Sequence, residues 1–267
     1  MKKLLAAVAI AALVAGCSPA ASTTTIATPA TDAPASTTAP ELTSSVSASA
    51  PYIVAAVADT HRPAADTAQD ALRHPAETLA LSGVAPGWKV GELLPGEGYF
   101  TRLLSNAVGA QGRVYAISRS AHAQYEHEVL VGTANVTNVI HPYDSFTLPA
   151  PVDLIFTARN YHDFKINEYH MGDTTALDRA AFAALKPGGV YVIIDHVANA
   201  GSVENQEHPL HRIDPALVRH EVEQAGFVFD GESQLLRNGA DPHTASVFDP
   251  SIRGHTDQFF MRFHKPS

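Results

Sequence analysis

The sequence predicts an α/β fold in which helices cover a β-sheet of mostly parallel strands. Beyond residue 55, short runs rich in β-branched residues alternate with amphipathic stretches of helical length, a pattern typical of strands joined by helices. One run, Lys89–Leu93, leads through a glycine-bearing turn directly into a helical stretch that starts at Tyr99. The last run, Gln258–His264, is apolar at alternate positions and is expected to close the sheet as an antiparallel strand.

The expected strands are short and are bounded by glycine, proline or aspartate. They are Lys89–Leu93, Arg113–Ile117, Val136–His141, Val152–Thr157, Val190–Asp195 and Gln258–His264. The expected helices are Ala64–Leu72, Pro75–Leu81, Tyr99–Val108, Ala121–Val131, Thr174–Leu185 and Pro215–Ala225. The last helix has Asp214 as its expected N-cap and ends at Gly226.

The first 16 residues have the three-part plan of a secretory signal peptide. Lys2 and Lys3 precede an apolar run, Leu4–Val14, and small residues precede Cys17. The run has about 11 residues, whereas a membrane-spanning helix needs about 20. The segment therefore predicts export and not a transmembrane helix.

The residues around Cys17 resemble the lipobox of bacterial lipoproteins. This resemblance implies that Cys17 is acylated and becomes the N-terminus after cleavage; the alternative is an ordinary signal peptide cut nearby. Several acyl chains on one residue give stable membrane anchoring. Ser18 resembles the residue after the cysteine in lipoproteins that are passed to the outer membrane. We therefore expect a lipid-anchored protein on the periplasmic side of the envelope, on the outer membrane and not the inner one.

Residues 17–55 are expected to form a disordered tether, and residues 56–267 the folded domain. Nearly every residue from Ser18 to Ala50 is alanine, serine, threonine or proline, which leaves too little apolar bulk for a core. Because Cys17 is the single cysteine, the domain has no disulfide and no cysteine nucleophile.

The charge and composition indicate which partners to expect. The formal net charge is −9 and aromatic residues make up 7% of the chain, without a cluster of lysine and arginine among them. Nucleic acid is therefore an unfavourable partner, and a small molecule is the expected one. The oligomeric state is left open.

The most informative stretch is the turn that follows the strand Lys89–Leu93. Glycines such as Gly96 and Gly98 let the backbone approach a ligand closely, and Glu92 at the strand end can accept hydrogen bonds from hydroxyl or amine groups of a nucleoside. The alternatives are a tight turn without a ligand and a surface carboxylate at a strand end.

Three segments resemble motifs of the class I S-adenosylmethionine-dependent methyltransferases. Glu92–Gly98 resembles the first motif, Asp153–Phe156 followed by Arg159–His162 resembles the fourth-strand motif, and Leu185–Val190 resembles the turn before the fifth strand. Arg62–Asp66, the pair His74-Pro75 and the Leu-Leu-Pro-Gly form of the first motif resemble a group of exported bacterial proteins that are predicted methyltransferases.

The resemblance implies a single Rossmann-like, doubly wound domain whose sheet has seven strands, the last one antiparallel. It also implies that S-adenosyl-L-methionine lies across the carboxyl ends of the first strands, where open α/β sheets bind ligands. The positions that it assigns to the cofactor are Glu92, Leu93, Pro95, Gly96, Gly98, Tyr99, Ser118, Asp144 and Asn160. Two positions differ from the family pattern, which has glycine in place of Leu94 and usually an acidic residue in place of Ser118.

His162 and Asp163 follow the fourth expected strand, where related enzymes reach the methyl group and the acceptor. The near-neutral pKa of a histidine suits removal of a proton from an acceptor hydroxyl or amine, so His162 is the candidate base. Asp163 is expected either to orient His162 or to cap the following turn. Because the chain has 14 histidines, the alternative is a solvated or hydrogen-bonded residue without a catalytic role.

A second group of polar residues lies in and after the fifth expected strand. It comprises Asp195, His196, Glu204, Glu207, His208, His211 and Asp214. The group could hold a divalent ion, but its spacing favours a polar substrate loop, and we assign it no metal. Arg62, Asp66 and Arg73 could clamp a carboxylate, but solvated ion pairs on a helix are the favoured interpretation.

The leading hypothesis is a methyltransferase that moves the methyl group of S-adenosylmethionine to a small molecule. An envelope-anchored binding protein that keeps the fold without methyl transfer is the alternative, since S-adenosylmethionine is made in the cytosol. A metal-dependent hydrolase that uses the histidine-rich loop is a third possibility.

Overall fold

The computed structural model describes residues 40–44, 46–119, 134–204 and 206–267. The signal peptide, Cys17 and the helix expected at Ala121–Val131 lie outside the described residues. Within the described ranges, no helix is both long and apolar enough to cross a bilayer.

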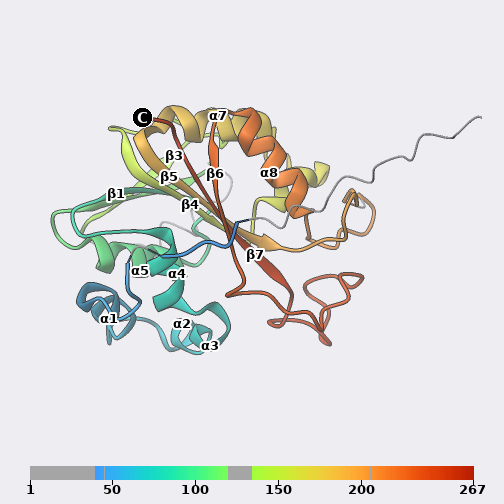
Figure 1. Ribbon diagram of the computed structural model, residues 1–267, viewed down its shortest axis with the longest axis horizontal. Coiled ribbons are helices and arrows are strands. Elements are labelled where there is room, and N and C mark those ends of the chain that lie inside the picture. The colour runs from blue at the N-terminus through green and yellow to red at the C-terminus, as the bar shows by residue number, and fades with distance from the viewer. Residues whose placement is uncertain (1–39, 45, 120–133, 205) are drawn as a thin grey trace, which may run out of the picture. The chain divides into compact units, whose positions relative to one another are not determined.

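Seven strands of the described residues form one sheet in the order β3-β2-β1-β4-β5-β7-β6 (Figure 1). They are β1 (Lys89–Leu93), β2 (Arg113–Ser118), β3 (Val136–Ile140), β4 (Val152–Ala158), β5 (Leu185–His196), β6 (Val228–Ser233) and β7 (Gln258–His264). Neighbours among β1 to β5 pair in parallel, whereas β7 runs antiparallel to both β5 and β6. The expected sheet of seven strands with a reversed last strand is confirmed.

Helices cover both faces of the sheet. The helices of the described residues are α1 (Pro51–Val57), α2 (Ala64–Thr67), α3 (Asp70–Arg73), α4 (Pro75–Ser82), α5 (Tyr99–Val108), α7 (Thr174–Ala184) and α8 (Pro215–Gln224), with 3-10 turns η1 (His162–Lys165) and η2 (Asn167–Tyr169). Figure 1 shows α1, α4 and α5 on one side of the sheet and α7 and α8 on the other. Because successive strand residues point to opposite faces, Leu154 and Ile155 of β4 enter two different apolar cores.

The folded unit begins earlier than the sequence suggested. Residues 40–55, which were expected to belong to the tether, contain most of helix α1 and a short segment that pairs with β6. The N–H group of Leu42 donates to the carbonyl of Glu232 at 2.7 Å, and the Leu42 side chain is buried. The composition of this segment resembles that of a linker, so its few apolar side chains gave no sequence signal.

Two other elements differ from the expectation. The helix expected at Ala64–Leu72 is two single turns, α2 and α3, and the carboxylates Asp66 and Asp70 on them are held by different arginines. Strand β6 was not expected. Its sequence contains Asp230 and Gly231, which are unusual in strands, and it lies at the edge of the sheet.

Helix α7 carries a buried carboxylate, Asp178. Asp178 is 0% exposed and accepts hydrogen bonds from the hydroxyls of Tyr161 at 2.8 Å and Tyr191 at 3.3 Å. Burial raises the pKa of Asp178 to about 7, and the nearby charge of Glu221 acts in the same direction, against the tyrosine hydrogen bonds.

We expect the packing of α1 to contribute measurably to stability. Ile53→Ala removes a side chain that is 0% exposed and should lower the free energy of unfolding by about 2 to 5 kcal/mol. Val54→Ala is the matched control, because Val54 is 50% exposed on the same helix and its loss should cost less than about 0.5 kcal/mol. Urea unfolding of both variants measures this, and equal losses would show that α1 does not pack on the apolar core that it shares with α4 and α5.

Asp178 should make stability fall as the pH rises. The folded protein keeps the proton of Asp178 up to pH about 7, whereas the unfolded chain releases it near pH 4. The stabilising effect of the bound proton is therefore full below pH 4 and is lost between about pH 4 and 7. Asp178→Asn removes this dependence. The difference in free energy of unfolding between the variant and the wild type should therefore shift by about 1 to 4 kcal/mol in favour of the variant from pH 4 to pH 8. Parallel curves of stability against pH for the two proteins would rule this out.

Candidate functional site

A pocket of about 480 Å³ lies at the carboxyl ends of β1 and β4, and we call it the β1 pocket. The turn between β1 and α5 forms one wall, and residues 158–160 after β4 form another. Arg73 of α3 and Tyr143 also line it. This is the edge of a parallel sheet at which α/β proteins bind ligands.

The turn between β1 and α5 has an unusual backbone. Leu94, Gly96 and Gly98 have φ angles of 50°, 55° and 80°. Glycine adopts such angles freely, whereas a leucine there costs roughly 1 to 2 kcal/mol. This strain gives a physical reason for the glycine that the methyltransferase motif has at the position of Leu94. The N–H group of Leu94 donates to the carbonyl of Ile117 at 3.1 Å and so ties the turn to β2.

Four of the residues expected to bind the cofactor line the β1 pocket through this strand and turn: Glu92, Leu93, Pro95 and Gly96. Glu92 is only 3% exposed, so its carboxylate is a buried acceptor at the strand end and not a surface group. Gly98 does not line the pocket; it precedes the first residue of α5 in a left-handed conformation.

Two further expected residues, Tyr99 and Asn160, line the pocket but have their polar atoms bound to protein. The hydroxyl of Tyr99 donates to Asp70 at 2.7 Å, so its ring forms a wall of the pocket. The amide of Asn160 donates to the carbonyl of Leu94 at 3.1 Å, and its oxygen accepts from the hydroxyl of Thr157. Asn160 therefore holds the β1 turn against β4.

The last two expected cofactor residues lie beside the β1 pocket. Asp144 lines a neighbouring pocket of about 300 Å³, which shares Arg119, Tyr143 and Met171 with the β1 pocket. Ser118 ends β2 and is buried, and its hydroxyl has no hydrogen-bond partner within the described residues. Ser118 is not among the residues that line the β1 pocket.

The arginines near the start of the domain are not solvated ion pairs, contrary to the favoured expectation. Arg62 is buried and binds both carboxylate oxygens of Asp70, at 2.9 and 2.6 Å. Asp66 accepts from Arg102 at 2.7 Å. Arg73 instead lines the β1 pocket, where its guanidinium lies 4.2 Å from the ring centroid of Tyr99. Burial lowers the pKa of Arg73, and its Nε has no hydrogen-bond partner among the described residues.

A second pocket of about 510 Å³ adjoins the first, and we call it the histidine pocket because His162, His196 and His211 line it. Arg159 and Asp163 line both pockets, so the two cavities meet at the segment after β4. Burial lowers the pKa of Arg159 to about 10, and repulsion by Arg73 acts in the same direction. The sequence did not single out Arg159 as a binding residue, although its motif was recognised.

His162 is held by the buried carboxylate of Asp195, which the sequence analysis placed in the second polar group. Nδ1 of His162 lies 2.7 Å from Asp195, and the backbone N–H groups of His162 and His196 donate to the same carboxylate at 2.8 and 2.7 Å. Asp195 thus performs the orienting role that was expected of Asp163. Asp163 lies on the other side of the ring, 3.1 Å from Nε2.

The charge state of His162 differs from the expectation. Burial alone would lower its pKa, but the carboxylates of Asp195 and Asp163 outweigh burial and raise the pKa to about 10. His162 is therefore protonated at neutral pH in this structure and can donate a proton but not accept one. The expected role as a near-neutral base does not fit this state. Burial and repulsion by His162 lower the pKa of the neighbouring His196.

The polar group expected to form a metal or substrate loop is dispersed. Glu204 accepts from the backbone of Leu210, and Asp214 caps α8 by accepting from Ala216. Three members of that group stay near His162: Asp195 binds its Nδ1, and His196 and His211 line the histidine pocket. Among the described residues, His211 is the member whose donor atom clusters with those of His162 and Asp163.

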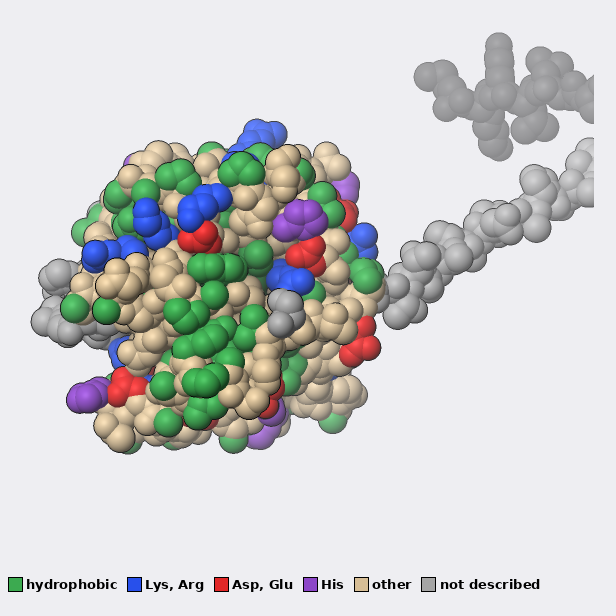
Figure 2. All heavy atoms as spheres, turned by 60° about the vertical axis from the view of Figure 1, so that its left-hand side comes forward, with side chains coloured by type: hydrophobic (Ala, Val, Ile, Leu, Met, Phe, Trp, Pro, Cys, Tyr) green, Lys and Arg blue, Asp and Glu red, His purple; other side chains and the backbone are tan. Residues whose placement is uncertain are grey.

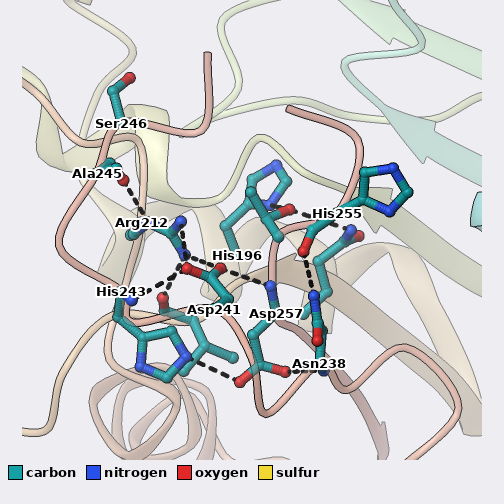
Figure 3. A network of polar contacts seen from close by, with 12 residues as sticks. His196, Arg212, Asn238, Asp241, His243, Ala245, Ser246, His255 and Asp257 are labelled. Carbon is teal, nitrogen blue, oxygen red and sulfur yellow. Dashed lines mark hydrogen bonds and ion pairs between the residues drawn. The ribbon is translucent and has the colours of Figure 1, made fainter. Parts of the chain in front are cut away.

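A buried network fixes the backbone beside His211 (Figure 3). Arg212 binds Asp241 at 2.8 and 3.1 Å and donates to the carbonyl of Ala245 at 2.9 Å. The N–H group of Asp257 donates to Asp241 at 2.7 Å, and Asp257 lies 3.0 Å from His243. Removing one member would leave a buried charge unpaired, so the network makes this wall of the histidine pocket rigid.

No family model matches the sequence, and no curated protein matches it. The fold does match solved structures. A SAM-dependent methyltransferase from Aquifex aeolicus is 20% identical, with a TM-score of 0.52 over 70% of this chain and 87% of that one. The [4+2]-cyclase SpnF is 15% identical, with a TM-score of 0.53 over 78% of this chain and 84% of that one. From its strand order, reversed last strand and these similarities, the chain has the class I methyltransferase fold.

Proposed function

We propose that the protein transfers a methyl group from S-adenosylmethionine to a small molecule bound in the histidine pocket. The observation that carries this proposal is the junction of two pockets at the carboxyl edge of a class I methyltransferase sheet. The β1 pocket lies where this fold binds a nucleoside cofactor, and the carboxylate of Glu92 offers it a buried hydrogen-bond acceptor. The histidine pocket opens beside it, where an acceptor could meet the methyl group.

Particular residues would hold the cofactor. Glu92 can accept from the ribose hydroxyls or the amine of the methionine moiety, and Arg73 offers a guanidinium to its carboxylate. The space beside Gly96 in the β1 turn is free of protein atoms, since a Cβ at this position would meet nothing within 4 Å. Ser118 cannot provide the charged acceptor that an acidic residue would provide at the end of β2.

The catalytic contribution of the chain would be mainly positional. Bound S-adenosylmethionine supplies an activated methyl group on its sulfonium centre. Asn160 fixes the β1 turn and Asp195 fixes His162, so the two pockets keep a constant separation. Holding a nucleophile and a methyl group in line accounts for most of the rate enhancement in such a transfer.

A binding protein without methyl transfer is the second candidate. Two observations support it. Leu94 is strained and Ser118 is neutral at positions where the methyltransferase motifs have glycine and an acidic residue, and a cyclase shares the fold. The face seen in Figure 2 intersperses acidic and basic side chains around apolar patches, so that face has no purely basic surface for a polyanion.

Location is a further part of the proposal. We infer that the protein is exported and anchored through acylated Cys17 on the periplasmic side of the outer membrane. The support is the signal-like segment of residues 1–16 and the lipobox-like residues before Cys17. Such a location makes the source of the methyl donor a central question.

The binding of S-adenosylhomocysteine tests the cofactor proposal. Glu92→Gln keeps the shape of the side chain but removes a charged acceptor, so we expect it to weaken the affinity at least about tenfold. Glu223→Gln on α8, where Glu223 pairs with Arg219, should leave the affinity unchanged. Isothermal titration with the purified protein measures both. No heat with millimolar S-adenosylmethionine or S-adenosylhomocysteine would contradict the proposal.

Labelling with a radioactive fatty acid tests the anchor. The wild-type protein in a bacterial host should incorporate palmitate and sediment with membranes, whereas Cys17→Ser should do neither, because serine has no thiol for the acyl transfer. A wild-type protein that is exported without label would show that an ordinary signal peptide is present.

A further inference from the structure

Three side chains with metal-binding donor atoms meet on the wall of the histidine pocket. One donor atom each of His162, Asp163 and His211 lies within 4.8 Å of the others. Nε2 of His162 is 3.1 Å, and Nδ1 of His211 is 3.5 Å, from Oδ1 of Asp163. Donor atoms on one zinc ion, with bonds of about 2.1 Å, lie about 3.0 to 3.5 Å apart. We propose that this cluster binds a divalent transition-metal ion such as Zn²⁺.

The orientation of His162 suits a metal ligand. Asp195 binds its Nδ1 at 2.7 Å, and Asp195 is itself fixed by two backbone N–H groups. A carboxylate on the far nitrogen of a histidine is the usual support of a metal-binding imidazole, because it places the proton on that nitrogen and leaves the other lone pair free for the ion. Nε2 of His162 then faces Asp163 and His211.

His211 is also held in place. Arg212, the next residue, is anchored by Asp241 and by the carbonyl of Ala245 (Figure 3). The ring of His211 lies perpendicular to that of His162, with centroids 5.3 Å apart, and packs edge-on against Phe248. Two histidines from different segments therefore face the carboxylate of Asp163. Asp195 holds His162, and the Arg212 network holds the backbone beside His211.

Charge favours a cation at this position. A metal ion at Nε2 would displace the proton that His162 carries without metal, and Asp163 and Asp195 would then bring two negative charges into a region where His162 is 4% and His211 8% exposed. Buried carboxylates without a balancing cation are costly, and one divalent ion would balance both. Two imidazoles and a carboxylate suit zinc and neighbouring metals, and three protein ligands leave coordination positions open to the pocket. If the proposed function holds, those positions would receive an oxygen of the acceptor.

Metal titration of the full chain tests this site without S-adenosylmethionine. After treatment with a chelator, the protein should bind one Zn²⁺ per chain by isothermal titration and one Co²⁺ with visible absorption. His211→Gln should weaken the affinity at least 100-fold. The matched control is His208→Gln, three residues earlier and exposed, which should bind as wild type does. Asp195→Asn should weaken binding about 10- to 100-fold, because the supporting carboxylate is lost.

Wild-type protein that binds no metal at millimolar concentration would overturn the proposal, as would retention of one ion by His211→Gln. Loss of binding in His208→Gln would assign the metal to the loop instead. The thermal midpoint of each variant without metal shows whether it folds, and if His211→Gln does not fold, Asp163→Asn takes its place with the same expected loss. Because no cofactor is present, failure of this site and failure of the methyl-transfer proposal are separate results.

Discussion

The carboxylate of Asp195 is the interaction on which the geometry of the site depends. It lies at the end of β5, is 0% exposed, and accepts from the ring and backbone of His162 and from the backbone of His196. A buried charge of this kind is tolerated only when its oxygens are fully hydrogen-bonded. These bonds fix the chain that leaves β4 against the chain that leaves β5, and the histidine pocket lies between the two.

The segment of residues 158–163 joins the two halves of the site. On one side, Asn160 binds the β1 turn and so holds Leu94 in its strained conformation. On the other side, Asp163 lies between the two histidines of the proposed metal cluster. A displacement of this segment would alter both pockets at once. The coupling offers a physical reason to expect one binding event to affect the other.

Much of the fold could be predicted from local sequence patterns. The strands β2, β4, β5 and β7 are rich in β-branched or aromatic residues, and the glycine-bearing turn after β1 marks the ligand-binding edge. Strand β6 and helix α1 gave weaker signals, because Asp230 and Gly231 resemble loop residues and residues 40–50 resemble a linker. Both elements are stabilised by tertiary pairing, which no local pattern encodes.

The site was predictable only in part. Glu92 and Gly96 follow from the strand and its turn, but the partners of Tyr99 and Asn160 are 29 and 66 residues away in the chain. Likewise, Asp195 is separated by 33 residues from His162, and only the folded sheet shows that Asp195, and not Asp163, holds the ring at Nδ1. The shift of the His162 pKa to about 10 follows from the contacts with Asp195 and Asp163, which outweigh burial, and could not be inferred from residue types.

A crystal structure of the protein grown with S-adenosylhomocysteine tests the central claim most directly. The structure predicts that the adenosine lies at the carboxyl end of β1 with a ribose or amine group within hydrogen-bond distance of Glu92, and with the sulfur facing the histidine pocket. A ligand bound elsewhere, or a β1 pocket that stays empty at millimolar ligand, would contradict it.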